Sequence, residues 1–478
     1  MRLLEYDCVM NVIGEVMKMG HVVSRRSKVG QNLTEGPILR TLITFAIPIV
    51  LASLVQQLYS LVDVIVIGKF VGNTGTVGVN TGGEIADMVM PVAMGISSAG
   101  QIYISQLTGA REEKKVQQTI GTLLSFMLMA SVVLALGTIV FSDVLLNWLN
   151  CPEEALGQAK DYMVITALGF PFIFGYNAVV AVLRGMGESK QSLYFILIAA
   201  AVNVVLDILL VTVIPLEAVG TAIATAVSQF GSFAAAAVFL WKKRERFGLE
   251  LKLSYFKLRS DVLWILIRLG IPQVIRSLLV RFGMLWVNAE ANSFGLVVSA
   301  TNSVGNKLNK FLEVFIQGVD AAATAMIGQN LGARKTQRAG KITLCTFGVA
   351  TFCATMAAIP MLLIPEAMFS LFTDDPAVIE LGAVYLRILV VLVYSSAFTG
   401  SFQTMVTGSG FVTLGFAIGV LDGLVCRVGL SWLFANVLGF GYIGLFWGAS
   451  TARIIPGLLC LGYFLSGKWK TRKLLTEK

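Results

Sequence analysis

The sequence predicts an all-α polytopic membrane protein with about twelve transmembrane helices, in two six-helix lobes related by a pseudo-twofold axis. Composition and an internal repeat lead to this fold class. Hydrophobic residues make up 56% of the 478 residues and charged residues only 14%, whereas soluble domains average about 25% charged residues. A membrane-spanning helix needs about 20 apolar residues, so the chain has room for about a dozen spans and for little soluble structure.

Twelve apolar runs separated by polar breaks mark the expected spans, and the basic stretch Trp241–Arg246 divides them into two sets of six. The expected spans start near Leu42, Gly78, Thr119, Asp161, Leu193 and Ala218, and then near Val262, Leu296, Ile342, Leu381, Val412 and Gly441. The predicted organisation is a cytoplasmic tail of residues 1–33, an N-lobe of 34–240, a cytoplasmic linker of 241–260, a C-lobe of 261–467 and a cytoplasmic tail of 468–478.

Lys and Arg residues concentrate in alternate loops. Basic clusters at 242–246 and 334–341 fall on the same side as both tails, whereas the opposite loops carry only Lys69 and Lys160. Cytoplasmic loops of membrane proteins hold the excess of basic residues. We therefore expect a multi-pass protein of the cell membrane with both termini in the cytoplasm.

The two halves of the chain repeat one another at an offset of 223 residues. Ile104–Arg111 (ISQLTGAR) recurs as Ile327–Arg334 (IGQNLGAR), and Gly185–Gly187 recurs as Gly408–Gly410. With one residue more, Ile47–Pro48 aligns with Ile271–Pro272. Because each half has an even number of spans, we expect parallel repeats related by an axis along the membrane normal. A cavity between the lobes and alternating access are then expected, which favours a transporter.

The chemistry-bearing residues exclude several classes of function. His21 is the only histidine and lies in the N-terminal tail, which removes most imidazole catalysis and most zinc sites. The six cysteines show no paired spacing and are expected to be buried apolar residues. The net charge of +9 reports membrane orientation rather than nucleic-acid binding. We expect no cofactor beyond a coupling ion, and no metal site.

Carboxylates inside apolar spans point to ion chemistry, because a mid-membrane charge costs about 2.5–3.5 kcal/mol. Asp63 lies late in the first span, and Tyr59 and Gln56 precede it by one and two turns on one polar stripe. Asp207 lies in the fifth span, four residues after Asn203. Removal from water favours the protonated carboxyl group, which suits both aspartates to bind and release a proton as access alternates. Gln56 and Tyr59 are candidates for the substrate cavity. The alternative is that both aspartates are structural hydrogen-bonding groups.

The second half does not repeat these acidic positions. Asp63 aligns near Val287, and Asn203 and Asp207 align with Cys426 and Leu430. A packing role shared by both lobes would be expected in both, so the asymmetry favours ion coupling.

Two other pairs of charged residues do occupy aligned positions. Glu84 and Asp87 of the second span align with Lys307 and Lys310 of the eighth. We hypothesise that the pairs form an ionic latch that closes the outer side. The alternative is that each side chain reaches water or pairs locally, for example Lys310 with Glu313.

Pro48 is a further gating candidate. It lies within the first apolar span, fifteen residues before Asp63, and a proline inside a helix kinks it. A bend there would move Asp63 during transport, or the kink is static.

The order of these features resembles the multidrug and toxic compound extrusion (MATE) family, in particular its DinF-like branch. The resemblance runs from about Thr34 to Gly467. The motifs that carry it are Glu35–Arg40 (EGPILR), Ile47–Pro48 with Gln56–Asp63 (QQLYSLVD), Leu183–Glu188 (LRGMGE), Asn203–Asp207 (NVVLD), Val219–Thr225 (VGTAIAT) and Gly328–Ala333 (GQNLGA).

The resemblance implies a twelve-helix fold and efflux of organic cations by a transporter driven by protons or sodium. In the DinF-like branch, an aspartate of the first helix, an Asn and an Asp of the fifth and a Thr of the sixth form the coupling site. The matching positions are Asp63, Asn203, Asp207 and Thr225. Pro48 matches the proline at which the first helix of that branch bends. We expect small amphipathic cations as substrates and a monomeric protein.

The chain departs from the NorM-like branch, which has acidic residues in the seventh and tenth helices. Here the seventh span carries Arg276 and Arg281, with Glu290 only at its far end. A C-lobe sodium site of that kind is therefore not expected. Glu313 and Asp320, seven residues apart on one face of the eighth span, are the predicted contacts for a cationic substrate in this lobe.

Two alternatives to an efflux antiporter remain open. The first is a related flippase for lipid-linked saccharides, which five basic residues favour: Arg276, Arg281, Lys307, Lys310 and Arg427. The second is an intramembrane aspartyl hydrolase in which Asp63 and Asp207 share a proton. The Gly-x-Gly-Asp context of membrane aspartyl proteases is missing from the sequence, so no enzymatic activity is expected.

Overall fold

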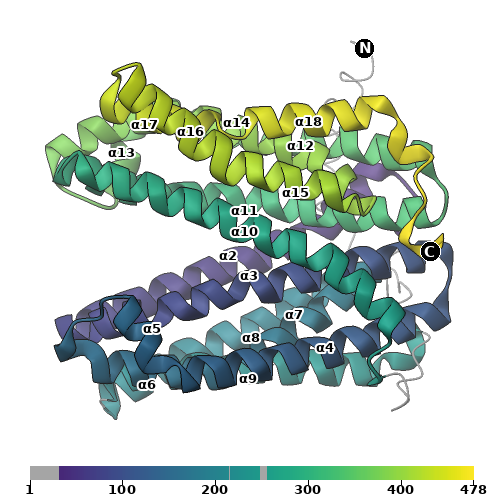
Figure 1. Cartoon of the computed structure of the whole chain (residues 1–478), viewed down its shortest axis with the longest axis horizontal. Helices are drawn as coiled ribbons and strands as arrows, with labels where there is room; N and C mark the ends of the chain where they lie inside the picture. The colour runs from purple at the N-terminus through teal and green to yellow at the C-terminus, as the bar shows by residue number, and fades with distance from the viewer. Residues whose placement is uncertain (1–31, 215, 248–255, 478) are drawn as a thin grey trace, which may run out of the picture. The chain divides into compact units, whose positions relative to one another are not determined.

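The computed structural model describes residues 32–214, 216–247 and 256–477, and every regular element among them is a helix (Figure 1). Eleven helical segments are long and apolar enough to cross a membrane. The helices α6 (Leu156–Leu168) and α7 (Phe170–Gly185), which are bent by 41° relative to one another, give a twelfth span if they are counted together. The bend falls at Gly169, and Pro171 fits the first turn of α7, where no intrahelical donor is needed. The predicted fold class is confirmed.

The spans follow the chain order that the sequence predicts. In the first half they are α2 (Ile38–Phe70), α3 (Gly72–Ala110), α4 (Glu113–Val140), α6 with α7, α8 (Lys190–Asp207) continued by the π-helix η3 (Ile208–Val213), and α9 (Glu217–Lys242). In the second half they are α10 (Ser260–Ser293), α11 (Leu296–Gly332), α12 (Thr336–Leu363), α14 (Pro376–Gly408), then α15 (Val412–Val420) with η6 (Leu421–Cys426), α16 (Arg427–Trp432) and η7 (Leu433–Val437), and finally α17 (Gly441–Thr451) with α18 (Ile454–Ser466). The short helices α5 (Ser142–Trp148) and α13 (Pro365–Ser370) lie in connections.

The internal repeat extends to unusual backbone conformations. Arg111 and Arg334 follow the ends of α3 and α11 and have φ of 60° and 57°, which is a left-handed conformation that non-glycine residues rarely adopt. The next amide in each case, that of Glu112 or Lys335, closes the helix end by donating to the carbonyl of Leu107 (3.0 Å) or Asn330 (2.8 Å). The duplication is therefore present in the backbone as well as in the sequence.

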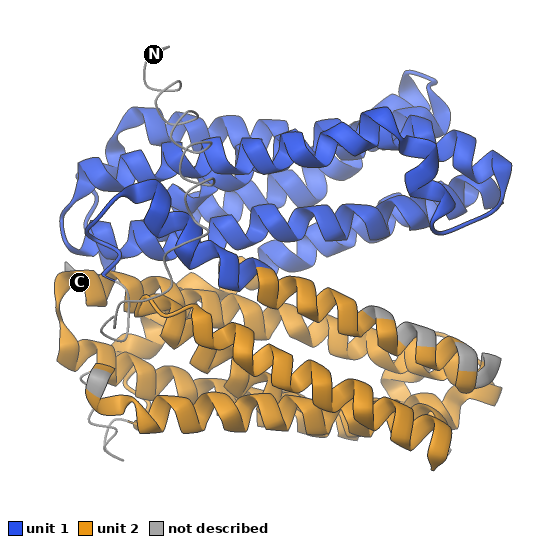
Figure 2. Ribbon diagram, turned by 180° about the vertical axis from the view of Figure 1, so that it is seen from behind, with its two compact units in different colours: residues 1–27, 32–50, 275–478 blue, residues 28–31, 51–274 orange. Residues whose placement is uncertain are grey.

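The described chain forms two compact units (Figure 2). Unit 1 contains residues 32–50 and the chain from Ile275 onward, and unit 2 contains residues 51–274 without the undescribed ones. Both boundaries lie two residues after a proline, Pro48 in α2 and Pro272 in α10. The units thus group residues 34–50 and 261–274 differently from the predicted lobes, which followed chain order alone. The lobe boundaries at 240 and 261 stay a prediction.

Apolar burial explains why α2 begins in unit 1. Leu42, Phe45 and Ile49 recur at helical spacing and lie in one buried cluster with residues of α11, α12 and α14. In unit 2, a hydrogen bond holds the start of α10 to α3. The Oγ of Ser98 donates to the Oε1 of Gln273 over 3.1 Å.

Both described ends of the chain dock on unit 1. Ahead of α2, the side chains of Asn330, Lys335 and Arg338 donate to the carbonyls of residues 33, 34 and 35 over 3.0, 3.0 and 2.9 Å. After α18, the Trp469 ring stacks on Phe464 with centroids 6.0 Å apart. Most of the predicted N-terminal tail, with His21, lies outside the described residues.

Candidate functional site

Unit 2 contains a pair of aspartates from two helices. Asp63 of α2 and Asp207, the last residue of α8, have their carboxyl groups within hydrogen-bonding reach of one another. Asp207 is 0% exposed, and Asn203, one turn earlier on α8, is 1% exposed. The sequence-predicted residues of the first and fifth spans are therefore brought together inside this unit.

These buried side chains lack hydrogen-bond partners. No donor among the described residues reaches Oδ1 of Asp63 or either carboxylate oxygen of Asp207, and the oxygen and nitrogen of the Asn203 amide have no described hydrogen-bond partner. Ionised carboxylates only accept hydrogen bonds, so two of them side by side cannot satisfy one another. Buried polar groups are almost always paired in folded proteins. A cluster of unpaired atoms at one place therefore marks a position where a proton or a small ion can bind.

Tyrosine and amide side chains surround the pair. The hydroxyl of Tyr59, one turn before Asp63, is within hydrogen-bonding reach of Gln56 and of Gln229 from α9. Tyr162 of α6 lies within electrostatic range of both aspartates. The polar stripe predicted on α2 thus faces polar groups of α6 and α9.

Thr225 lies on α9 and is half-buried. Its carbonyl accepts a hydrogen bond from Ser228 over 2.8 Å. Its assignment to the coupling site stays a prediction, as does that of Gln56 and Tyr59 to a substrate cavity.

A change of helix type begins at the aspartate. Immediately after Asp207, α8 widens into the π-helix η3, and the aligned region of the second half widens into η7. π-helical turns occur frequently at functional sites. The second half has an additional π-helix, η6, and this one contains the buried carboxylate of Asp422.

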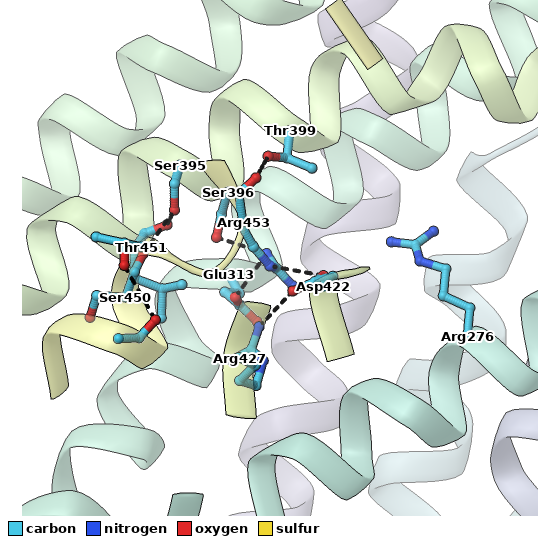
Figure 3. Close-up of polar contacts among 12 residues, drawn as sticks. Arg276, Glu313, Ser395, Ser396, Thr399, Asp422, Arg427, Ser450, Thr451 and Arg453 are labelled. Carbon is cyan, nitrogen blue, oxygen red and sulfur yellow. Dashed lines mark hydrogen bonds and ion pairs between the residues drawn. The ribbon is translucent and has the colours of Figure 1, made fainter. Parts of the chain in front are cut away.

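Unit 1 contains a different polar centre, a buried network of charges (Figure 3). Arg453, between α17 and α18, pairs with Glu313 of α11 (Nη1–Oε1 3.2 Å) and with Asp422 (Nε–Oδ2 3.6 Å). It also donates to the Oγ of Ser396 over 2.7 Å. Arg427 donates to Oδ1 of Asp422 over 3.0 Å. Side chains from four helical elements and from the α17–α18 junction are joined in this way.

Glycines allow this network to form. A Cβ at Gly283 of α10 would overlap the carbonyl oxygen of Gly423 in η6, so the two backbones touch. This close approach brings the first half of η6, with Asp422, against α10. Small residues serve the same purpose at many membrane helix contacts.

Glu313, a member of the network, and Asp320, which lies near it, were both predicted as substrate contacts. The carboxylate of Glu313 is paired with Arg453, and Asp320 lies two turns further along α11. Asp422 and Arg453 were missed by the sequence interpretation, and Arg427 was noted only as a basic residue. The available signal was the presence of these charges within apolar runs, where each charge needs a partner or a function.

The gating candidates belong to different units. Glu84 and Asp87 lie on α3 in unit 2, and Lys307 and Lys310 are exposed on α11 in unit 1. Pro48 is buried within α2. The ionic latch and the bend at Pro48 stay predictions. Among the residues that the structure describes, no group of three or more His, Cys, Asp or Glu side chains is placed to hold a metal ion.

Comparison with known proteins agrees with this architecture. A family model described as MatE matches residues 48–209 and 272–433, and both segments start at the repeated proline. "Probable multidrug resistance protein YpnP" of Bacillus subtilis (strain 168) is 26% identical over 452 residues, which cover 94% of this chain and 99% of that protein. "Multidrug export protein MepA" of Staphylococcus aureus (strain NCTC 8325 / PS 47) is 23% identical over 440 residues, covering 89% and 93%.

The fold is also that of a solved transporter. The structure titled "Outward-facing conformation of a multidrug resistance MATE family transporter of the MOP superfamily" superimposes with a TM-score of 0.87 at 20% identity, over 94% of this chain and 100% of that one. The DinF-like branch stays a prediction. Since the MatE model matches more than half of the chain and eleven described helices are long and apolar enough to cross a membrane, this protein is a multi-pass membrane transporter of the MATE family and not an enzyme.

Proposed function

We propose that this protein is a proton-coupled antiporter that exports small amphipathic organic cations by alternating access. The observation that carries the proposal is the pair formed by Asp63 and Asp207, with three carboxylate oxygens that have no donor among the described residues. The names of the relatives, which refer to multidrug resistance and multidrug export, support efflux of small molecules.

One proton satisfies the pair in a way that no described neighbouring side chain does. Two adjacent negative charges that are largely removed from water repel one another and are poorly solvated. A single shared proton removes one charge and turns one carboxyl group into a donor for the other. When access changes to the side with the lower proton concentration, the proton leaves and the repulsion returns. Proton binding can therefore favour one conformation, as ion coupling requires.

The distribution of basic residues supports an orientation for this cycle. Both tails and the 334–341 cluster fall on one side, which the positive-inside rule makes cytoplasmic. We infer that the protein lies in the cell membrane with both termini in the cytoplasm. Both units belong to one chain, so we infer that it acts as a monomer.

The charge balance of unit 1 argues against the alternative flippase. A lipid-linked pyrophosphate carries at least two negative charges and needs unpaired cations. Arg427 and Arg453 are already paired with Asp422 and Glu313, so neither is free to bind a pyrophosphate. Export of organic cations is therefore favoured over a flippase.

The test is transport in proteoliposomes with a pH gradient or a sodium gradient imposed separately. The substrate is a fluorescent organic cation, and the variants are Asp63→Asn and Asp207→Asn. Asp161→Asn is the matched control, because Asp161 is an exposed aspartate of the same unit. Wild type and control should accumulate dye with the pH gradient, and both pair variants should not. Uptake driven only by sodium, or full uptake by both pair variants, would contradict proton coupling at this site.

A further inference from the structure

Arg276 of α10 is a half-buried cation whose hydrogen-bond partner is neutral. Its Nη2 donates to the Oε1 of Gln403 on α14 over 2.9 Å. Among the described residues, no carboxylate oxygen lies close enough to the Arg276 guanidinium to form an ion pair, which requires an N–O distance of 4.0 Å or less. Figure 3 shows Arg276 apart from the connected network, with its guanidinium directed toward it. The Asp422 carboxylate acts on this guanidinium only at a distance longer than that of an ion pair. A guanidinium in a partly buried position without a carboxylate in direct contact is energetically unfavourable.

The remaining charges of the network are accounted for, with one exception. Arg427 and Arg453 are paired with Asp422 and Glu313. The exception is Asp320 of α11, which forms no ion pair among the described residues and whose Oδ1 is buried without a hydrogen-bond partner. Arg276 and Asp320 are thus a cation and an anion beside the network that form no ion pair with a described residue.

The two unpaired groups lie in the same neighbourhood without joining. Arg276 and Asp320 are within electrostatic range of one another, and Arg453 also acts on Asp320 without forming an ion pair with it. Gln403 contacts Arg276, and Gly400, one turn earlier on α14, contacts the Asp320 carboxylate, which a Cβ at this glycine would overlap. One turn of α14 therefore lies against both charges.

A second glycine accommodates the arginine. A Cβ at Gly419 of α15 would overlap the stem of Arg276. Both charged side chains are therefore seated against glycines from other helices, which fixes where their stems lie. Preorganised charges of opposite sign, separated and unpaired, match a ligand that carries both signs itself.

We propose that Arg276 and Asp320 form a binding site for zwitterionic small molecules, in which Arg276 binds a carboxylate and Asp320 binds the cationic group. A guanidinium can hold a carboxylate by two parallel hydrogen bonds. This inference rests on the proposed function in one respect, since it names a substrate class of the same transporter. It extends the substrates from cations to molecules that also carry one anionic group.

The test uses a rhodamine dye with a free carboxylate and the methyl ester of the same dye. The two molecules share their cationic ring system and differ in the anionic group. Binding to purified protein in detergent is measured by fluorescence anisotropy, which requires no ion gradient. Wild type should bind the carboxylate dye more tightly. Arg276→Gln should lower the affinity for that dye roughly tenfold or more and leave the affinity for the ester unchanged. Asp320→Asn should lower the affinity for both dyes.

Two variants separate recognition from folding. Arg276→Lys keeps the charge without the fork of donors and should retain part of the preference. Arg268→Gln removes an exposed arginine of the same helix and should change neither affinity. Unchanged ester binding by Arg276→Gln shows that this variant is folded. If Arg276→Gln does not fold, Arg276→Lys provides the test. Equal changes in its affinity for the two dyes would overturn the proposed site.

The outcome separates this inference from the proposed function. Equal affinity of wild type for the two dyes, or equal losses in Arg276→Gln, would overturn the zwitterion site even if proton-driven efflux of the ester is found. A preference that depends on Arg276, without transport of either dye in any gradient, would support the site and contradict the proposed antiport.

Discussion

Asp63 and Asp207 face one another in unit 2, and neither has an acidic counterpart at the aligned positions of unit 1, which are Val287 and Leu430. The converse holds for the charge network of unit 1. Asp422 and Arg427 align with Ala199 and Val204. The duplicated halves therefore keep one backbone plan and carry different charged centres. We assign proton coupling to the first centre and substrate recognition to the second.

The unpaired carboxylates of unit 2 are expected to lower stability in exchange for function. If the folded pair holds a proton that the unfolded chain releases, the wild type binds more protons when folded and loses stability as pH rises. Asp207→Asn removes that proton and should unfold at a higher temperature than wild type at alkaline pH, with the difference shrinking at acid pH. Thermal unfolding in detergent across a pH series measures this. A wild type that gains stability as pH rises, relative to the variant, would be inconsistent with a shared proton.

Asp63 and Asp207 should act as one unit. Because both carboxyl groups hold the same proton, removing either abolishes coupling, and removing both costs no further transport activity. The measurement is proton-driven dye uptake by the two single variants and by the double variant Asp63→Asn/Asp207→Asn. Additive partial losses would indicate two independent sites.

Arg453 should be a major contributor to the stability of unit 1. Arg453→Met leaves Glu313 unpaired in a buried position, and breaking a buried ion pair costs about 3–5 kcal/mol. The free energy of unfolding in detergent should fall accordingly. The added change Glu313→Gln should recover part of the loss, because it removes the uncompensated charge. Lys160→Met breaks the exposed pair with Asp143 and should cost about 1 kcal/mol or less.

Gly400 should be required for the position of Asp320. Gly400→Ala places a methyl group where the carboxylate lies, so it should displace Asp320 and weaken binding of both rhodamine dyes. Gly231→Ala is the matched control on α9, because a Cβ there meets nothing within 4 Å. The control should be neutral or stabilise the protein by roughly 0.5–1 kcal/mol. Equal dye binding by the two variants would show that Gly400 does not seat the carboxylate.

Pro48 and Pro272 should affect transport more than binding. Each lies two residues before the point at which its helix leaves one compact unit for the other, and each removes one backbone donor from that helix. Pro48→Ala and Pro272→Ala restore the donor, stiffen the helix and should slow dye transport while leaving dye affinity in detergent unchanged. Pro91→Ala, within α3 and inside unit 2, should have little effect on transport.

Much of the fold could be predicted from the sequence, since each span is a long apolar run and the repeat fixes the correspondence between halves. The meeting of Asp63 and Asp207 could also be anticipated, because both are carboxylates on polar faces of apolar helices. The exchange of the first segments of α2 and α10 between units could not be predicted from chain order, since it depends on which cluster buries Phe45. Nor could the pairing of Arg453 with Glu313, because residues 140 positions apart carry no local pattern that links them.

The central claim is that dye export and proton entry are one process at the Asp63–Asp207 pair. The most direct measurement loads proteoliposomes with the cationic dye and a trapped pH indicator, with equal pH inside and outside and no sodium. As the dye leaves through the wild type, protons should enter and the lumen should acidify. Asp63→Asn and Asp207→Asn should show no acidification. Dye exit through the wild type without any change of lumenal pH would contradict the claim.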